Sequence, residues 1–497
     1  MTSDLLPSTA DIVVAGGGPA GASIARLLSG LGFRVVIFEK RRFPRHQIGE
    51  SLTPRILPIL DFLDVRARIE AAGFLRMVGH TVCWGSEHPR TSYYSDDHSR
   101  RGFQVRREDF DALLLQHARE GGVQVYEEHF VKNVQLHHSG VIVTTPYGQT
   151  QAAFFIDATG HAGTLARQQL RRRDPVFQTL AIASYWQGAS GPSGVEFANT
   201  LLETYENGLV WSVPLHNGLR NVTLLIDWEI GGHMRRSGIQ EFYLREIGKA
   251  SYIPRFLQNA HIVIPPRAFD ATWHTATNFS SDRFLLVGDA GMFIDPLSSE
   301  GVHKAMASAI TGAVVTNTIL QRPVMTSLAR QFYDESQHAT YETHYRQSVV
   351  YYCEETRWPN APFWRRRSQS QFRVLSAASR APSSQPLSPS KRVISHLRIA
   401  AGVTIAQRPV IEGPFVELRA VVVAPLHPRG IRFLDNICLP PLLEIIERQR
   451  AVIRIIPAFL SSPEGKNCSP EAVRQILARL YQEGMLITTA PDETRSS

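Results

Sequence analysis

Cysteine is scarce in this sequence, which has four cysteines among 497 residues and no C-x-x-C pair. The wide spacing argues against a zinc site and against a disulfide framework, so we expect no metal. Long apolar runs are also lacking, because none reaches about eighteen residues. The first residues do not show the basic-then-apolar order of a signal peptide. We therefore expect no membrane span and a cytoplasmic location.

Charge of one sign is not concentrated either. Lys and Arg total 53 against 45 Asp and Glu, so the formal charge of +8 is spread over a long chain and thickens only around residues 365–367. A solvated basic surface explains this excess better than a nucleic-acid site, and we expect no nucleic-acid partner. The length exceeds the roughly 250–300 residues of a single core, which predicts two or three domains.

A glycine-rich turn near the amino terminus is the first positive signal. A short buried strand is predicted over residues 11–15, and an apolar helix follows the turn and runs to Leu31. This order of strand, glycine turn and helix is typical of a dinucleotide site. Gly16 permits the tight turn, Gly18 lets a pyrophosphate approach the backbone, and Gly21 allows close packing of the helix on the strand.

A second strand is predicted over residues 34–38, and it ends in an acidic residue. Glu39 follows Gly21 by eighteen positions, which is where a carboxylate accepts hydrogen bonds from the adenosine ribose. The same carboxylate disfavours a 2′-phosphate. The combination of strand, turn, helix and acidic residue predicts a bound dinucleotide.

Later segments resemble FAD-dependent oxidoreductases. Residues 154–160 resemble their second dinucleotide segment, and residues 284–290 resemble their third, in which an Asp binds the FAD ribityl chain. Asp295-Pro296 and then Gly301-Val302-His303 follow, and the latter opens a helix whose amino terminus would face the flavin. The resemblance therefore implies FAD as the cofactor.

Finer motifs resemble the flavin-dependent halogenases and FAD-dependent monooxygenases over roughly residues 9–370. They are residues 43–46 with 49–51, residues 103–111 with Arg106 in the arginine position, and residues 293–303. The resemblance implies an α/β fold in which an FAD-binding Rossmann-type (GxGxxG) domain holds an inserted antiparallel β-sheet substrate domain. The implied cofactor-binding residues are Gly16, Gly18, Pro19, Ala20, Gly21, Glu39, Lys40, Arg45, Ser51, Arg106, Asp289, Pro296, Gly301 and Val302.

The residues that halogenases use are replaced in this sequence. Met77 stands at the position of the lysine that handles hypohalous acid, and a thioether cannot replace an amine there. Glu300 stands where halogenases have a Ser or Thr beside the halide, and a carboxylate repels an anion. The Trp-x-Trp-x-Ile-Pro segment keeps only its second Trp, Trp211, and its proline, Pro214.

We therefore expect a monooxygenase that uses a flavin C4a-hydroperoxide to hydroxylate an electron-rich aromatic substrate. O2 is the expected co-substrate. No second glycine fingerprint exists, so NAD(P)H reduces the flavin either directly or through a separate flavin reductase. Two alternatives stay open: a halogenase of an aromatic substrate, and a flavin reductase or dehydrogenase, because residues 299–306 are also similar to geranylgeranyl reductases.

The candidate catalytic residues are Glu300, Glu50 and His80, each a possible base for a phenol or indole proton. His161 and His303 are further titratable candidates close to the flavin-associated segments. Four aromatic residues of the middle region either line the substrate site or pack in the core: Tyr185, Trp186, Phe197 and Trp211.

The predicted organisation has five parts: FAD-binding segments over residues 1–175 and 276–375, a substrate sheet over 176–275, a linker over 376–395, and a small carboxy-terminal domain over 396–497. In that last domain, helices over residues 439–447 and 469–480 and a strand after Gly484 predict a winged-helix-like α/β domain. Such a domain resembles precursor-binding domains of peptide-modifying enzymes, so we expect the aromatic substrate to be bound to a peptide or a carrier protein; a structural lid is the alternative.

Overall fold

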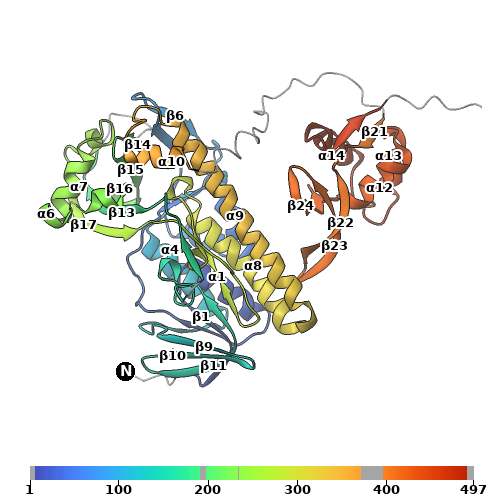
Figure 1. Ribbon diagram of the computed structural model, residues 1–497, viewed down its shortest axis with the longest axis horizontal. Coiled ribbons are helices and arrows are strands. Elements are labelled where there is room, and N and C mark those ends of the chain that lie inside the picture. The colour runs from blue at the N-terminus through green and yellow to red at the C-terminus, as the bar shows by residue number, and fades with distance from the viewer. Residues whose placement is uncertain (1–5, 169, 191–197, 233, 371–395, 490–497) are drawn as a thin grey trace, which may run out of the picture. The chain divides into compact units, whose positions relative to one another are not determined.

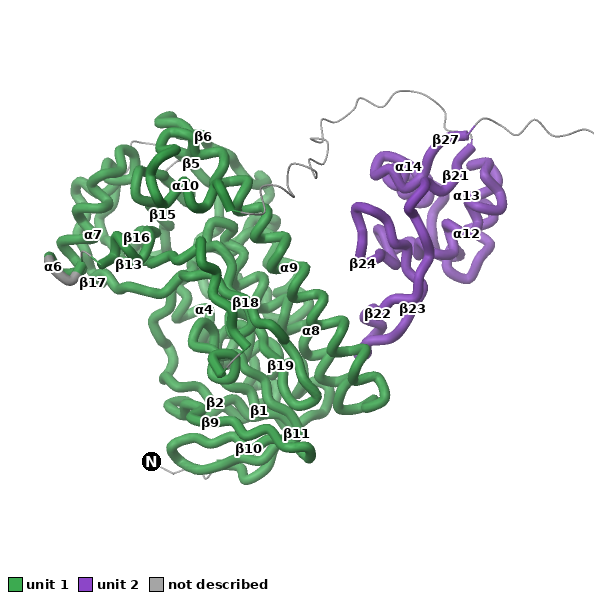
Figure 2. The backbone as a smooth tube through the Cα atoms, in the orientation of Figure 1, with its two compact units in different colours: residues 1–380 green, residues 381–497 purple. Residues whose placement is uncertain are grey.

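The computed structural model describes residues 6–168, 170–190, 198–232, 234–370 and 396–489. The chain divides into two compact units, Met1–Arg380 and Ala381–Ser497 (Figure 2). The predicted linker over residues 376–395 lies outside the described residues. Within those residues, every helix is too short or too polar to cross a lipid bilayer.

The first large sheet of unit 1 is the dinucleotide-binding sheet (Figure 1). Its strands follow the order β8-β2-β1-β11-β10-β9, with β19 beside β11, and the pairs around β1 are parallel. Strand β1 is buried on both faces, as its run of β-branched residues predicts. The strands are β1 (Thr9–Ala15), β2 (Val35–Phe38), β8 (Gln124–Tyr126), β9 (Asn133–His137), β10 (Gly140–Thr145), β11 (Gly148–Asp157) and β19 (Phe284–Leu286).

Three helices pack around the glycine turn of this sheet. Helix α1 (Pro19–Gly30) contacts both α4 (Arg107–Glu120) and α8 (Gly301–Gln321). Helix α1 starts directly after β1 and returns to β2, which is the connection of a Rossmann-type unit. The predicted fold class is confirmed.

The second large sheet has seven strands in the order β17-β13-β16-β15-β14-β5-β6. It is wider than the predicted segment 176–275, because β5 and β6 come from residues 79–93 and β5 pairs in parallel with β14. The sequence did not predict this pairing, because β5 and β14 are far apart in the chain. The strands are β5 (Gly79–Cys83), β6 (Arg90–Tyr93), β13 (Thr179–Gln187), β14 (Thr200–Tyr205), β15 (Gly208–Pro214), β16 (Leu219–Asp227) and β17 (His261–Asp270).

Both faces of the second sheet are covered. Leu180 and Ile182 of β13 pack toward α7 (Ile239–Ile247), whereas the intervening Ala181 packs toward α9 (Thr326–Glu354) and α10 (Pro362–Ser368). This alternation is the two-residue period of a strand between two apolar layers.

Two three-stranded sheets carry flavin-associated motifs. One joins β3, β7 and β4, and the other joins β12, β18 and β20. They bring segments that are far apart in the sequence into register. The strands are β3 (Ser51–Leu52), β4 (Leu75–Arg76), β7 (Phe103–Gln104), β12 (Arg171–Arg173), β18 (His274–Ala276) and β20 (Met292–Phe293).

Unit 2 has the helices and the strand that the sequence predicts, plus elements that it does not. Its strands β22, β23 and β24 form an antiparallel sheet, and β21 pairs with β27. A third helix, α13, lies between the two predicted helices. The sequence did not predict it, because Pro457 lies inside this helix and proline is unfavourable there. The elements are β21 (Leu397–Ile399), β22 (Thr404–Glu412), β23 (Phe415–Ala424), β24 (His427–Ile431), α12 (Leu439–Gln449), α13 (Val452–Leu460), α14 (Pro470–Gln482) and β27 (Leu486–Thr488).

Candidate active site

The glycine turn after β1 uses its glycines in two ways. Gly16 has φ of +99°, and a Cβ on Gly16 or Gly21 would collide with backbone atoms of the turn itself. These two glycines are needed for packing. A Cβ on Gly18 would meet only Nη2 of Arg45, at 3.1 Å, so Gly18 faces space that a pyrophosphate can occupy.

Glu39 lies at the end of β2 and is almost fully buried. Its Oε2 accepts a hydrogen bond from the Gly17 N–H at 2.7 Å, and its Oε1 accepts one from the Arg41 N–H at 2.9 Å. The sequence predicts that this carboxylate binds the ribose. In the structure the carboxylate also stabilises the glycine turn, because it accepts a hydrogen bond from a backbone N–H of the turn.

Cations gather beside this turn. Arg45 lies 3.8 Å from Glu39 and 3.4 Å from Asp111, and Asp111 is also paired with the buried Arg107 at 2.9 Å. Burial, followed by the charge of Arg41, lowers the pKa of Lys40. Lys40 is thus a cation whose charge is destabilised in the protein alone, and the diphosphate of a dinucleotide is an anion that would stabilise it.

Asp289, in the short helix η7 (Gly288–Ala290), lies in the third predicted segment. Burial would raise the pKa of Asp289, but Lys304 Nζ at 2.7 Å lowers it below its ordinary value. The backbone carbonyl of Asp289 accepts from Nε2 of His274 at 2.9 Å, and burial lowers the pKa of His274 to about 3. The loop is thus held by a neutral histidine and a buried lysine.

The space between these segments fits FAD. A Cβ on Gly160 or on Gly301 would meet nothing within 4 Å, and Gly18 is nearly as open. Gly301 opens α8, and the first N–H groups of a helix favour a negative charge beside them. Pro19, Ala20 and Val302 lie in the first turns of α1 and α8, and Pro296 begins η8 (Pro296–Ser298).

Two residues of the predicted cofactor set turn toward other partners. Ser51 Oγ lies 3.4 Å from Thr200 Oγ1, so this side chain faces the second sheet. Arg106 precedes α4 and forms an ion pair with Glu108. It also lines a small cavity with His46 and Tyr185, beside the buried Glu50.

Glu50 directly precedes β3 and connects the small β3-β7-β4 sheet to β13 of the second large sheet. Its Oε1 accepts a hydrogen bond from the Tyr185 O–H at 2.5 Å, and its Oε2 accepts one from the Gly49 N–H at 2.9 Å. Burial raises the pKa of Glu50 and also that of Tyr185. Glu50 is therefore a buried carboxyl that resists ionisation, and it positions Tyr185 of β13.

Glu300 is the centre of a second group of polar residues, which we call the Glu300 cluster: Thr53, Arg55, His80, Tyr94, Glu300, His303 and His344. Glu300 precedes α8, and its Oε2 lies 3.1 Å from His303 Nδ1 and 3.3 Å from Arg55 Nη1. Thr53 donates to Oε1 at 3.3 Å. Burial would raise the pKa of Glu300, but His303, Arg55 and His344 lower it below its ordinary value.

Tyr94 connects His80 to this cluster. The rings of His80 and Tyr94 are 5.9 Å apart, and burial together with the charge of Glu300 raises the pKa of Tyr94. Burial lowers the pKa of His80. Two of the three predicted catalytic residues, Glu300 and His80, thus belong to one cluster, while Glu50 belongs to a separate pair with Tyr185.

Sequence reasoning missed Arg55, Tyr94 and His344. They come from the short helix η1 (Pro54–Ile56), from the segment after β6 and from the middle of α9. No motif joins these segments, and only the tertiary fold brings them together.

The contacts of Met77 and Arg76 bear on whether Arg76 could replace the missing lysine. Met77 is buried and its N–H donates to Gly102 O at 3.0 Å. Arg76 instead pairs with Glu70 at 2.6 Å and lies over the Phe103 ring at 4.1 Å. Its guanidinium is therefore committed to these partners.

The four candidate aromatic residues have different surroundings. Trp186 belongs to the core, where its Nε1 donates to Tyr243 Oη at 3.1 Å. Tyr185 bonds to Glu50, and Trp211 is half-buried between two hydrophobic clusters. Phe197 lies outside the described residues. His161 contacts His274 edge to face at 4.8 Å and packs close to the Asp289 loop.

Comparisons with known proteins show the family to which the chain belongs. The family model described as an FAD binding domain matches residues 9–314. A tryptophan 2-halogenase of Chondromyces crocatus is 35% identical over 344 residues, 66% of this chain and 65% of the halogenase. The flavin-dependent halogenase armH4 of Armillaria mellea is 30% identical over 375 residues, 67% of this chain and 70% of that protein. The chain therefore spans about two thirds of the length of these relatives.

Two solved structures match nearly the whole chain. The flavin-dependent halogenase CmlS has a TM-score of 0.79 and 26% identity, with 96% of each chain covered. QhpG, a peptidyl tryptophan dihydroxylase essential for tryptophylquinone cofactor biogenesis, has a TM-score of 0.70 and 25% identity, covering 96% of this chain and 99% of its own. The chain therefore belongs to the flavin-dependent halogenase-like family of FAD-dependent enzymes.

Proposed function

We propose that this enzyme is an FAD-dependent monooxygenase that hydroxylates an electron-rich aromatic group. The observation that carries the proposal is the buried Met77 at the position where the family's halogenases have a lysine. A thioether cannot form a chloramine, and the nearest guanidinium, Arg76, is held by Glu70. Glu300 adds a negative charge at the sequence position where halogenases have a Ser or Thr beside the halide.

FAD, when bound, supplies the activation of O2, with electrons from NAD(P)H directly or through a flavin reductase. The protein's residues orient the ring and handle its proton. Glu300 remains ionised because His303 and Arg55 stabilise its charge, so it accepts a proton from a phenol or an indole. Tyr94 lies near this carboxylate, and the ring of His80 lies 5.9 Å from the ring of Tyr94. Glu50 holds the Tyr185 hydroxyl.

We further propose that the aromatic group is presented on a peptide or a carrier protein, and that unit 2 helps to capture it. The support is the likeness to QhpG, which acts on a peptidyl tryptophan and which this chain matches through both units. CmlS also matches through both units, so a lid is the competing role for unit 2.

A halogenase is the second candidate, and the names of the relatives favour it. The test is to reduce the FAD-loaded enzyme without oxygen and then mix it with O2 and substrate, with and without chloride or bromide. We expect products that gain the mass of oxygen and rates that do not depend on halide. A halogenated product would establish the second candidate instead.

The reductase-type alternative gives a third outcome in the same experiment. A reductase or dehydrogenase transfers hydrogen without incorporating oxygen. Mass spectrometry with ¹⁸O2 separates the two, because only a monooxygenase places the label in the product.

A further inference from the structure

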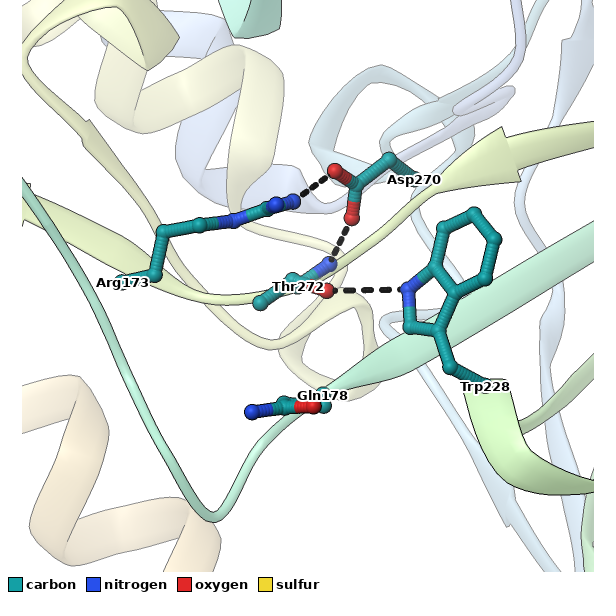
Figure 3. Close-up of a pocket in the computed structure, with 5 residues that line it drawn as sticks. All are labelled: Arg173, Gln178, Trp228, Asp270 and Thr272. Carbon is teal, nitrogen blue, oxygen red and sulfur yellow. Dashed lines mark hydrogen bonds and ion pairs between the residues drawn. The ribbon is translucent and has the colours of Figure 1, made fainter.

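A cavity of about 340 Å³ lies on unit 1 at the junction of four segments (Figure 3). Its lining comes from the end of β12, the residue before β13, the start of α5 (Trp228–Gly231) and the end of β17. None of these residues belongs to the glycine turn or to the Glu300 cluster. The lining residues are Arg173, Gln178, Trp228, Asp270 and Thr272.

The indole of Trp228 is a fixed platform in this cavity. It is 43% exposed. Its Nε1 donates to Thr272 Oγ1 at 3.1 Å, and the Thr272 N–H donates to Asp270 Oδ1 at 3.0 Å. The ring is therefore held in one orientation with part of its face open to a ligand.

The polar groups around the indole are balanced. Arg173 forms an ion pair with Asp270, so the lining carries no net charge and does not suit a phosphate. The Gln178 amide extends beside the cavity, and Figure 3 draws no bond from it to the other lining residues. An amide both donates and accepts hydrogen bonds, and its natural partner is another amide.

We propose that this cavity binds an aromatic residue within a peptide, with the ring against Trp228 and the neighbouring peptide amide at Gln178. The volume lies in the range of ligand pockets, roughly 300–1,000 Å³. The proposal extends the proposed function, because it gives a peptide substrate a second point of attachment besides the oxidation site.

The floor of the cavity is tied to the flavin-associated loop. The Thr272 carbonyl lies 3.4 Å from His161 Nε2, and His161 contacts His274, which bonds to the Asp289 carbonyl. A peptide held here is therefore attached to the same rigid part of unit 1 that carries the third cofactor segment.

The test measures binding of N-acetyl-tryptophanamide to the oxidised FAD-loaded protein by titration calorimetry, without reductant. Trp228→Ala removes the platform, and an aromatic pair is worth about a tenfold change in affinity. Gln178→Ala should weaken binding about threefold, because one neutral hydrogen bond is lost. N-acetyl-glycinamide, which has no ring, should not bind.

Matched variants keep the test falsifiable. Trp228→Phe retains a ring and should retain most of the affinity, even though it loses the bond to Thr272. Tyr147→Ala removes an exposed aromatic side chain from the turn between β10 and β11 and should change nothing. Equal affinity of the Trp228→Ala and unaltered proteins would overturn the proposal. A halogenated product in the mixing experiment would leave this binding result as it is, so the two failures are distinguishable.

Discussion

The predicted nucleotide end and the predicted ring end of the cofactor site are built in different ways. At the predicted nucleotide end, backbone atoms of residues 16–21 form the turn, and Glu39 holds it through a backbone N–H. At the predicted ring end, side chains from η1, α8 and α9 surround Glu300. A backbone site needs glycine at fixed spacings, whereas a side-chain site needs only a fold that brings its residues together.

The largest expected effect concerns the nucleotide end. Gly18→Val should abolish FAD retention, because its side chain would fill the space of the pyrophosphate while meeting only Arg45 of the protein itself. The measurement is the flavin absorbance of the purified protein after desalting. Gly30→Ala, at the other end of α1, is the control, because its Cβ would meet only the flexible Arg26 side chain. Full flavin content in Gly18→Val would contradict a backbone-built site.

The ring end should respond in rate rather than in flavin content. Glu300→Gln keeps the shape of the side chain and removes its charge, so kcat should fall about 100-fold, as for loss of a general base. Flavin content should be unchanged. Glu342→Gln is the control, since Glu342 is exposed on α9 and pairs with Arg346 at 3.5 Å. If kcat is the same in Glu300→Gln and in the control, Glu300 is not the base.

His274, which donates to the Asp289 carbonyl, should make the stability of the fold depend on pH. Burial lowers the pKa of His274 to about 3, whereas the unfolded chain has the ordinary value near 6.5. Between these values the unfolded state binds more protons, so stability falls as the pH falls. From pH 7.5 to 5 this costs about 2 kcal/mol.

Urea unfolding at the two pH values measures this term. In His274→Gln the pH dependence should be smaller than in the unaltered protein by that amount. His98→Gln, at an exposed position in the helix η2 (His98–Arg100), should behave as the unaltered protein does. An unchanged slope in His274→Gln would show that His274 does not stay neutral in the fold.

This contrast also explains what the sequence could predict. The fold class, FAD and the positions of Gly18, Glu39 and Asp289 follow from local spacing, because each motif lies within one strand-turn-helix segment. The cluster partners Arg55 and His344 could not be predicted, since no local pattern joins η1 to α9. The parallel pairing of β5 with β14 was missed for the same reason.

The smallest expected effect concerns unit 2 and peptide capture. Deleting residues 396–497 should leave flavin content and peroxide formation unchanged, because the glycine turn and the Glu300 cluster lie entirely in unit 1. The KM for a peptide substrate should rise about tenfold, which is the loss of roughly 1.4 kcal/mol of binding. The KM for a free aromatic amide should not change. Equal peptide kinetics with and without unit 2 would make it a structural appendage.

A single substitution tests the same idea inside the full chain. Strand β27 pairs only with β21 among the described residues, so its other edge is open to an added strand. The Ala400 N–H donates to the Met485 carbonyl, and the Thr489 N–H donates to the His396 carbonyl. Alternate residues of an antiparallel strand bond to the same neighbour, so Met485 and Thr489 face β21 and the N–H of Thr488 points to the open edge. Thr488→Pro removes that N–H and should reproduce part of the rise in KM for the peptide. Thr488→Val keeps the N–H and should match the unaltered enzyme, and a rise in both variants would assign the effect to the side chain instead of to strand addition.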